Sequence, residues 1–270
     1  MLSDLHIHTT YSDGKFTPMQ VLDYISSHGI KKFAITDHDS VSGYKELLRY
    51  IGNDPRLISG IELTTDTKGV HILGYKLDVE APILKTFLEK QKYNGVCDFV
   101  RIFMKVKEAS LDITENDFGK KYGIIDEDMI ADIIVRKGYA RDTYEAYNKY
   151  LIEGAPCYLK RKRPTVDECV KLIIDCGGHP VLAHPFTALH LCCDINDYLL
   201  QMKRKGIVGV EIINFRHYKK AHVEAIKAAK DADLYLTWGS DFHSPDKYRN
   251  FMLLQCHYQA KYQIYENGLI

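Results

Sequence analysis

Short apolar segments of this chain alternate with helix-like ones, and metal-binding side chains stand where many of the apolar segments end. The pattern begins at Asp4-Leu5-His6-Ile7-His8 and closes at Gly239-Ser240-Asp241-Phe242-His243. Strands that are joined by helices run parallel, so their carboxyl ends meet at one edge of a sheet. The sequence therefore predicts an α/β fold that assembles one polynuclear metal centre from residues far apart in the chain.

The order of the elements follows from cap signals and apolar spacing. Thr17-Pro18-Met19-Gln20 combines a capping box with proline at the first helical position, and Thr165-Val166-Asp167-Glu168 is a second capping box. About seven strands, mostly separated by helices, imply a parallel sheet, and that many favour closure into a barrel. The strands are expected over residues 4–9, 32–36, 57–63, 70–77, 180–183, 208–213 and 234–238.

A helical block interrupts this alternation. Residues 82 to about 110 have helical spacing, more short helices follow through Glu153, and no strand stands out. We therefore expect a barrel built from residues 1–80 and 160–270, which carries the metal site, and a helical insertion (cap) subdomain of residues 81–159.

Composition argues against several classes of protein. The 270 residues carry 36 Lys plus Arg and 36 Asp plus Glu, so strong nucleic-acid binding through bulk charge is not expected. No signal peptide is evident, and no stretch reaches the roughly 18 apolar residues of a membrane span. The 7 cysteines lack C-x-x-C spacing, which is typical of reduced thiols. We expect a cytoplasmic protein without membrane contact, and composition does not indicate its oligomeric state.

Two pairs of candidate ligands have i, i+2 spacing. His6 with His8, and Asp241 with His243, can each direct both side chains to the same side of an extended segment. Ile7 then points into the packing. Such a pair is a weak signal by itself, because exposed histidines also pair by chance.

Three other candidates have ordinary structural alternatives. Asp13 precedes a glycine and, taken alone, is a turn former. His71 lies between two β-branched residues, where a hydrogen-bonded core histidine is the commoner case. Glu62 stands on an apolar strand, and a carboxylate there needs a partner such as a metal ion or an arginine.

The joint pattern decides between these alternatives. So many His, Asp and Glu residues at strand ends are hard to explain as independent caps and core histidines, and none of them is Cys, which argues against a structural zinc site. Imidazole with carboxylate suits two or three Mn²⁺, Fe²⁺ or Zn²⁺ ions. Clustered divalent ions imply hydrolysis of phosphate esters, with amide hydrolysis as the competing possibility. The candidate ligands are His6, His8, Asp13, His38, Glu62, His71, His184, Asp241 and His243.

The segments that carry these residues together resemble the PHP (polymerase and histidinol phosphatase) family. All ligand positions of that family are matched, and the resemblance covers residues 1 to about 80 and 160 to about 250. It implies a distorted (β/α)7 TIM-like barrel with a trinuclear Mn²⁺, Fe²⁺ or Zn²⁺ centre. Gly138-Tyr139, Glu145-Ala146-Tyr147 and Lys149-Tyr150-Leu151 resemble the branch of bacterial 3′,5′-nucleotide bisphosphate phosphatases and the 5′-end RNA exonuclease.

The same resemblance implies roles for the ligands. A hydroxide that bridges two ions would attack phosphorus, and we expect Glu62, Asp241 and His243 to be the catalytic residues. One ion would be held by His6, His8, Glu62 and Asp241, a second by Asp13, His38 and His243, and a third by Glu62, His71 and His184.

Departures from this branch weaken the case for a nucleotide bisphosphate or RNA. Asn94 and Asp98 stand where the branch usually has arginines, and Glu127-Asp128-Met129 replaces its Arg-Pro-His segment. A smaller substrate, such as a sugar phosphate or a cyclic phosphate diester, becomes plausible. Basic side chains at the edge of the barrel either contact the substrate or are simply solvated, and the candidates are Arg161, Arg216 and His217.

We therefore expect a metal-dependent phosphoesterase that acts, as monoesterase or cyclic diesterase, on a small phosphorylated metabolite such as a nucleotide or sugar phosphate. One alternative is a 3′,5′-nucleotide bisphosphate phosphatase or 5′–3′ RNA exonuclease. A second is an amidohydrolase-like hydrolase or an inactive PHP module used for binding. The complete ligand set argues against the inactive module.

Overall fold

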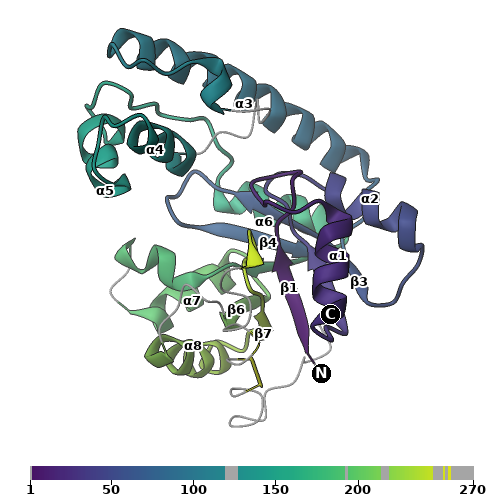
Figure 1. The fold of residues 1–270 in the computed structure, drawn as a ribbon. Helices are drawn as coiled ribbons and strands as arrows, with labels where there is room; N and C mark the ends of the chain where they lie inside the picture. The colour runs from purple at the N-terminus through teal and green to yellow at the C-terminus, as the bar shows by residue number, and fades with distance from the viewer. Residues whose placement is uncertain are drawn as a thin grey trace. The chain divides into compact units, whose positions relative to one another are not determined.

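The chain forms two compact units, which differ in architecture (Figure 1). The computed structural model describes residues 2–118, 127–191, 194–213 and 219–245, together with residues 252, 255 and 256. We call the first unit, Met1–Lys85 with Arg163–Ile270, the barrel unit, and the second unit, Thr86–Lys162, the helical unit.

The barrel unit is built on one sheet of seven strands that follow each other in sequence order. Most of their residues are buried, because the strands contribute side chains both to the inside of the sheet and to the layer beneath its helices. The strands are β1 (Ser3–Ile7), β2 (Lys32–Ile35), β3 (Leu57–Thr64), β4 (His71–Tyr75), β5 (His179–Leu182), β6 (Gly209–Ile213) and β7 (Tyr235–Trp238).

The sheet closes on itself, because the segment after β7 returns to β1. Ile7 and Phe242 form a parallel bridge, and the His8 N–H donates to the Phe242 carbonyl at 2.9 Å. Trp238 Nε1 donates to Ser3 Oγ at 2.7 Å in the same seam. The predicted closure into a distorted seven-stranded barrel is confirmed.

One strand runs against the predicted direction. β4 pairs antiparallel with both β3 and β5, whereas a wholly parallel sheet was expected. The physical reason is the length of the connection: residues 65–70 alone join β3 to β4, and a parallel return needs a crossover of about a dozen residues. The first residue of β4, His71, consequently pairs with Thr64, the last residue of β3.

Helices connect most of the strands, and both predicted capping boxes are confirmed. Thr17 and Gln20 form a capping box with both reciprocal bonds, as do Thr165 and Glu168. The helices of the barrel unit are α1 (Pro18–Ser27), α2 (Ser42–Ile51), α6 (Val166–Asp175), α7 (Ile195–Arg204) and α8 (Lys219–Asp231), with the 3-10 segment η3 (Pro185–Leu191).

The helical unit has its own apolar core and, in the residues described, no strand. The long helix α3 (Pro82–Glu108) begins in the barrel unit and continues into this one. Ile102, Val106, Ile130 and Ile134 are buried in the core. The remaining elements are η1 (Glu115–Phe118), α4 (Glu127–Arg136), α5 (Thr143–Ala146) and the π-helical turn η2 (Tyr147–Leu151). None of the described helices combines the length and apolar character needed to cross a bilayer.

Candidate metal centre

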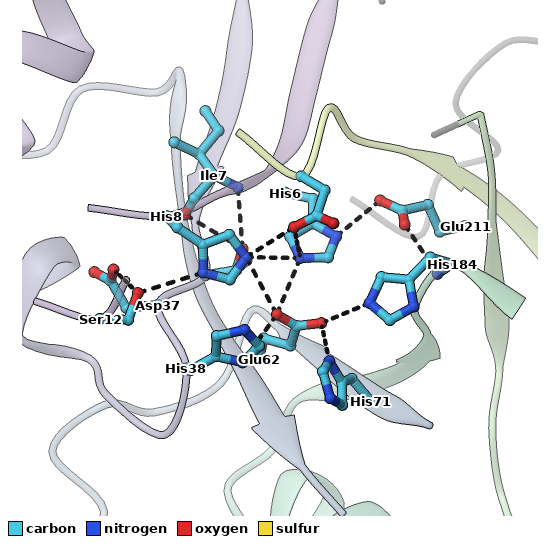
Figure 2. Close-up of polar contacts among 12 residues, drawn as sticks. His6, Ile7, His8, Ser12, Asp37, His38, Glu62, His71, His184 and Glu211 are labelled. Carbon is cyan, nitrogen blue, oxygen red and sulfur yellow. Dashed lines mark hydrogen bonds and ion pairs between the residues drawn. The ribbon is translucent and has the colours of Figure 1, made fainter. Parts of the chain in front are cut away.

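The candidate ligands come together at one edge of the barrel. Figure 2 shows His6, His8, His38, Glu62, His71 and His184 turned toward one another. Strands β1 and β3 supply His6 and Glu62 directly, and the other ligands stand in the segments just past strands. His71 is the exception, because it is the first residue of β4. The reversed direction of β4 brings that amino end to the edge where the other strands have their carboxyl ends.

Glu62 lies among five imidazole rings. Its Oε2 atom is 3.1 Å from His6 Nε2, 3.2 Å from His8 Nε2 and 3.2 Å from His38 Nδ1. Its Oε1 atom is 3.0 Å from His71 Nδ1 and 3.1 Å from His184 Nε2. In the part of the chain that the structure describes, the partners of this fully buried carboxylate are therefore imidazoles and not an arginine.

Asp241 and Asp13 extend the cluster on either side of His8. Asp241 Oδ1 lies 3.2 Å from His8 Nε2, and Asp13 Oδ1 lies 3.5 Å from His8 Nδ1. Asp13 Oδ2 also lies 2.8 Å from His243 Nε2. Side chains with ligand atoms within 4.8 Å of one another form three groups: His8, Asp13, His38 and His243; His6, His8 and Asp241; and His38, Glu62 and His71.

These groups overlap with, but do not equal, the three sets implied by the family resemblance. His8 belongs to two of the groups, and His38 joins the group of Glu62 and His71. His184 stands outside the groups, although its Nε2 atom contacts Glu62. The assignment of ligands to individual ions therefore stays a prediction.

The donor set fits divalent cations. Glu62 Oε2 and Asp13 Oδ1 are buried and accept no hydrogen bond from the described residues. A buried oxygen without a donor is costly, and a metal ion would satisfy it. The Nε2 atoms of His6 and His8 face each other at 3.0 Å, as two nitrogens directed at one cation would. Imidazole with carboxylate is a ligand set for Mn²⁺, Fe²⁺ or Zn²⁺.

The electrostatics differ between the histidines of the site: the pKa values of His6 and His8 are raised, whereas burial lowers the pKa of His38 to about 3. Burial lowers the pKa of His6, but nearby carboxylates, Glu62 foremost, outweigh burial and raise that pKa well above its ordinary value. Burial lowers the pKa of His8, but the carboxylates of Asp13, Asp241 and Glu62 outweigh burial and raise this pKa to about 10. Burial raises the pKa of Glu62, but the surrounding imidazoles outweigh it and hold this pKa well below its ordinary value.

Comparison with known proteins identifies the family. The chain matches the PHP domain over residues 4–161, more than half of its length. The chain belongs to the PHP domain family. The match includes the candidate ligands from His6 to His71, whereas His184, Asp241 and His243 follow it in the chain.

Relatives of this PHP chain include several phosphoester hydrolases. A 3′,5′-nucleoside bisphosphate phosphatase from Chromobacterium violaceum is 28% identical over 250 residues, which cover 90% of this chain and 87% of that protein. A 5′-3′ exoribonuclease from Haemophilus influenzae is 26% identical over 251 residues, 90% of each chain. A phosphoribosyl 1,2-cyclic phosphate 1,2-diphosphodiesterase from Eggerthella lenta is 26% identical over 255 residues, 90% of this chain and 94% of that protein.

A solved structure shares the whole fold. It is described as an amidohydrolase from Chromobacterium violaceum with bound sulfate and no metal. It superposes with a TM-score of 0.78 at 25% sequence identity, covering 92% of this chain and 89% of that one. The similarity extends across the length of the PHP chain.

A second layer of polar residues lies behind His8 of the PHP centre. Ser12 Oγ lies 3.4 Å from His8 Nδ1 and donates to Asp37 Oδ1 at 2.6 Å. Asp37 also accepts the Thr9 N–H and hydroxyl, at 2.7 and 2.8 Å. A Cβ atom at Gly43 would lie 2.3 Å from Asp37 Oδ2, so the glycine leaves room for this carboxylate at the start of α2.

Glu211 is a functional candidate that was not predicted from the sequence. It is fully buried in β6, and its Oε1 atom lies 3.0 Å from His6 Nδ1. The signal was present: Glu211 is a lone carboxylate in the apolar run 207–213, and the argument that selected Glu62 applies to it equally.

The backbone is strained at two of the candidate ligands. His184 has φ +24° and Asp241 has φ +54°, in the region that side chains other than glycine seldom adopt. Such conformations cost of order 1–3 kcal/mol and persist where the surroundings over-determine them, often at functional sites. This strain shows that the fold holds His184 and Asp241 in place.

Three basic residues were predicted to contact the substrate, namely Arg161, Arg216 and His217. Arg161 is half-buried and belongs to the helical unit. Arg216 and His217 fall outside the described residues. Their contact with a substrate stays a prediction.

Proposed function

We propose that this PHP chain is a metal-dependent phosphoesterase that hydrolyses a phosphate monoester or cyclic diester of a small phosphorylated metabolite. The observation that carries the proposal is the position of Glu62, a fully buried carboxylate among five imidazoles, with an oxygen that accepts no hydrogen bond within the described part of the chain. The relatives support the reaction class, because the names of the phosphatase, diphosphodiesterase and exoribonuclease all denote cleavage of phosphate esters.

Two or three Mn²⁺, Fe²⁺ or Zn²⁺ ions would be held by the candidate ligands, among which Glu62 contacts imidazoles through both of its oxygens. When bound, such ions supply an activated water and neutralise charge on the phosphate. The chain's own contribution is to fix the ligands. His243 Nδ1–H donates to the Asp241 carbonyl at 2.8 Å, which leaves Nε2 facing Asp13. We assign the catalytic role to three of these ligands, Glu62, Asp241 and His243.

Exposure supports a direction of approach for the substrate. Among the candidate ligands, His6, His8 and Glu62 are fully buried, whereas Asp13, His38, His71 and His243 are partly exposed. The phosphate would therefore meet the partly exposed side chains first. The described cysteines are free thiols, which is compatible with a reducing cytoplasm.

A second candidate substrate class is a 3′,5′-bisphosphorylated nucleoside or the end of an RNA. It is supported by relatives named for these activities, which are 28% and 26% identical, while the cyclic phosphodiesterase is 26% identical. The replacement of arginine positions by Asn94 and Asp98 in α3 weighs against it. These identities do not separate the classes, so the substrate has to be decided by assay.

The test is a phosphate-release screen with metal-free protein reloaded with Mn²⁺, Fe²⁺ or Zn²⁺ separately. Ribose phosphates, cyclic phosphates, 3′,5′-bisphosphoadenosine, a short 5′-phosphorylated RNA and an amide panel are the substrates. Release of phosphate or ring opening of a cyclic ester in at least one arm is expected. Turnover of amides alone would overturn the phosphoesterase proposal in favour of an amidohydrolase. Absence of stoichiometric metal would instead indicate a binding module.

A further inference from the structure

Glu211 contacts two candidate ligands from different strands. Its Oε1 atom lies 3.0 Å from Nδ1 of His6, at the end of β1, and its Oε2 atom accepts the N–H of His184, just past β5, at 3.0 Å (Figure 2). We propose that Glu211 is a positioning residue for the metal centre, which fixes the ring of His6 and the backbone of His184 at once. This inference rests on the proposed metal-dependent function.

The contact with His6 decides which ring nitrogen faces the centre. A neutral imidazole carries one N–H, and a carboxylate beside Nδ1 keeps that hydrogen on Nδ1. Nε2 is then the nitrogen with a lone pair. It points at the centre, 3.0 Å from His8 Nε2 and 3.1 Å from Glu62 Oε2. Without Glu211, His6 would lose the group that selects this tautomer.

The contact with His184 holds a strained backbone. His184 has φ +24°, and its N–H bond to Glu211 is one of the interactions that fix the peptide in this conformation. The ring is held separately, because Nδ1 lies 2.9 Å from Thr187 Oγ1. Backbone and ring together direct His184 Nε2 at Glu62 Oε1, 3.1 Å away.

The packing around Glu211 is adapted to this arrangement. Gly239 follows β7, and a Cβ atom there would lie 2.2 Å from His6 Cβ and 2.7 Å from Glu211 Oε1. Only a residue without a side chain leaves room for the carboxylate and the imidazole to meet. The glycine is thus an independent sign that the fold accommodates this contact.

A single carboxylate therefore serves ligands of different parts of the centre. His6 groups with His8 and Asp241, whereas His184 contacts Glu62, which groups with His38 and His71. Replacing Glu211 should consequently weaken more than one ion position. Replacing a residue that supported only the fold would not change the affinities of particular ion positions.

The test compares Glu211→Gln with Thr237→Val. The amide of glutamine has one acceptor oxygen, so it can keep the bond to His6 or to His184 but not both. Thr237 pairs with Glu211 across β6 and β7, is equally buried, and its hydroxyl has no hydrogen-bond partner among the described residues. Thr237→Val is therefore a control of matched depth that removes no contact to a ligand.

Titration of metal-free protein with Mn²⁺ is the first readout. Glu211→Gln is expected to lose roughly 10- to 100-fold in affinity, at more than one equivalent, as outer-shell changes do. Thr237→Val should bind as the wild type does. Equal Mn²⁺ affinities in wild type and Glu211→Gln would overturn the inference.

A second readout needs no variant. In wild-type protein loaded with Zn²⁺, nitrogen-resolved NMR of the histidine side chains should show His6 with its hydrogen on Nδ1. A His6 that carries its hydrogen on Nε2 would refute the positioning role even if Glu211→Gln failed to fold. Failure of the proposed function is a separate result. Wild-type protein that binds Mn²⁺ but cleaves no phosphate ester would refute the proposed activity. The role of Glu211 would still be tested by the Mn²⁺ affinity of Glu211→Gln relative to the wild type.

Discussion

Glu62 Oε2 lies 3.1 Å from His6 Nε2, yet this buried oxygen accepts no hydrogen bond from the described residues. A negative charge held in this way is compensated only when a cation arrives or when the neighbouring imidazoles hold protons.

Glu62→Gln should therefore remove the charge on which the centre depends. We expect the loss of more than one equivalent of bound Mn²⁺ and a fall in hydrolysis beyond the roughly 100-fold of an outer-shell change. Metal analysis after dialysis, with the activity of the same sample, checks this. Glu89→Gln, on the exposed surface of α3, is the control and should keep both properties. Full metal content in Glu62→Gln would contradict a shared carboxylate.

Asp241→Asn should abolish turnover without unfolding the chain. Asparagine tolerates the left-handed conformation that Asp241 has at φ +54°, so the backbone is preserved while the anionic ligand is lost. Asp233→Asn is the matched control, since Asp233 has φ +50° but is exposed and pairs with Lys203 instead of a candidate ligand. Circular dichroism and turnover decide the outcome. Normal rates in Asp241→Asn, or in the companion variant His8→Ala, would refute the assignment.

Gly239→Ala should weaken metal binding and stability together. The added methyl group would meet His6 Cβ at 2.2 Å, and overpacking of this kind costs about 1–3 kcal/mol. Gly29→Ala provides the comparison: Gly29 has φ +73° with open space around it, so strain of about 1 kcal/mol is its only cost. Denaturant unfolding and Mn²⁺ titration of both variants are the measurements. Only Gly239→Ala should lose affinity.

Metal binding should release protons at neutral pH. In the metal-free protein burial lowers the pKa of His8, but Asp13 and its neighbours outweigh it and raise the pKa to about 10, so His8 is protonated at pH 7. A metal ion must displace this proton, and its affinity should rise as the pH increases toward that pKa. Calorimetric titration in buffers of different ionisation enthalpy measures the release. A binding heat that does not depend on the buffer would contradict the prediction.

Ile134→Ala should destabilise the helical unit without lowering the affinity of the protein for Mn²⁺. Ile134 is fully buried in the core of that unit, and Ile134→Ala should cost about 2–5 kcal/mol of its stability. All candidate ligands belong to the barrel unit, so Mn²⁺ affinity should not change. Val100→Ala, at a half-exposed position of α3, should alter neither property. Thermal unfolding followed with and without Mn²⁺ separates the two effects, and a drop in affinity in Ile134→Ala would refute the independence.

The strand ends could be predicted because apolar runs and metal-binding residue types are local features of the sequence. The direction of β4 could not be predicted in the same way, since the pattern around His71 is the same whichever way the strand runs. Only the short connection of residues 65–70 carries that information. Asp13 and His71 also show the limit of single residues: each has an ordinary explanation alone, and only the shared edge of the barrel makes it a ligand candidate.

Contacts between distant side chains were the part that could not be predicted. Glu211 meets His6 across 205 positions of sequence, and no local spacing indicates such a partner. Asp37 lies in a segment that was already of interest, but its bonds to Ser12 and Thr9 depend on how β2 is placed beside β1.

The bridge between Ile7 and Phe242 links closure of the barrel to completion of the metal centre. Phe242 lies between Asp241 and His243, so the residues that close the barrel are the neighbours of the last ligands to be synthesised. Before this segment is synthesised, one edge of β1 is unpaired, and His6 and His8 lack their contacts with Asp241. Closure of the barrel and completion of the ligand set therefore depend on the same short segment, residues 241–243.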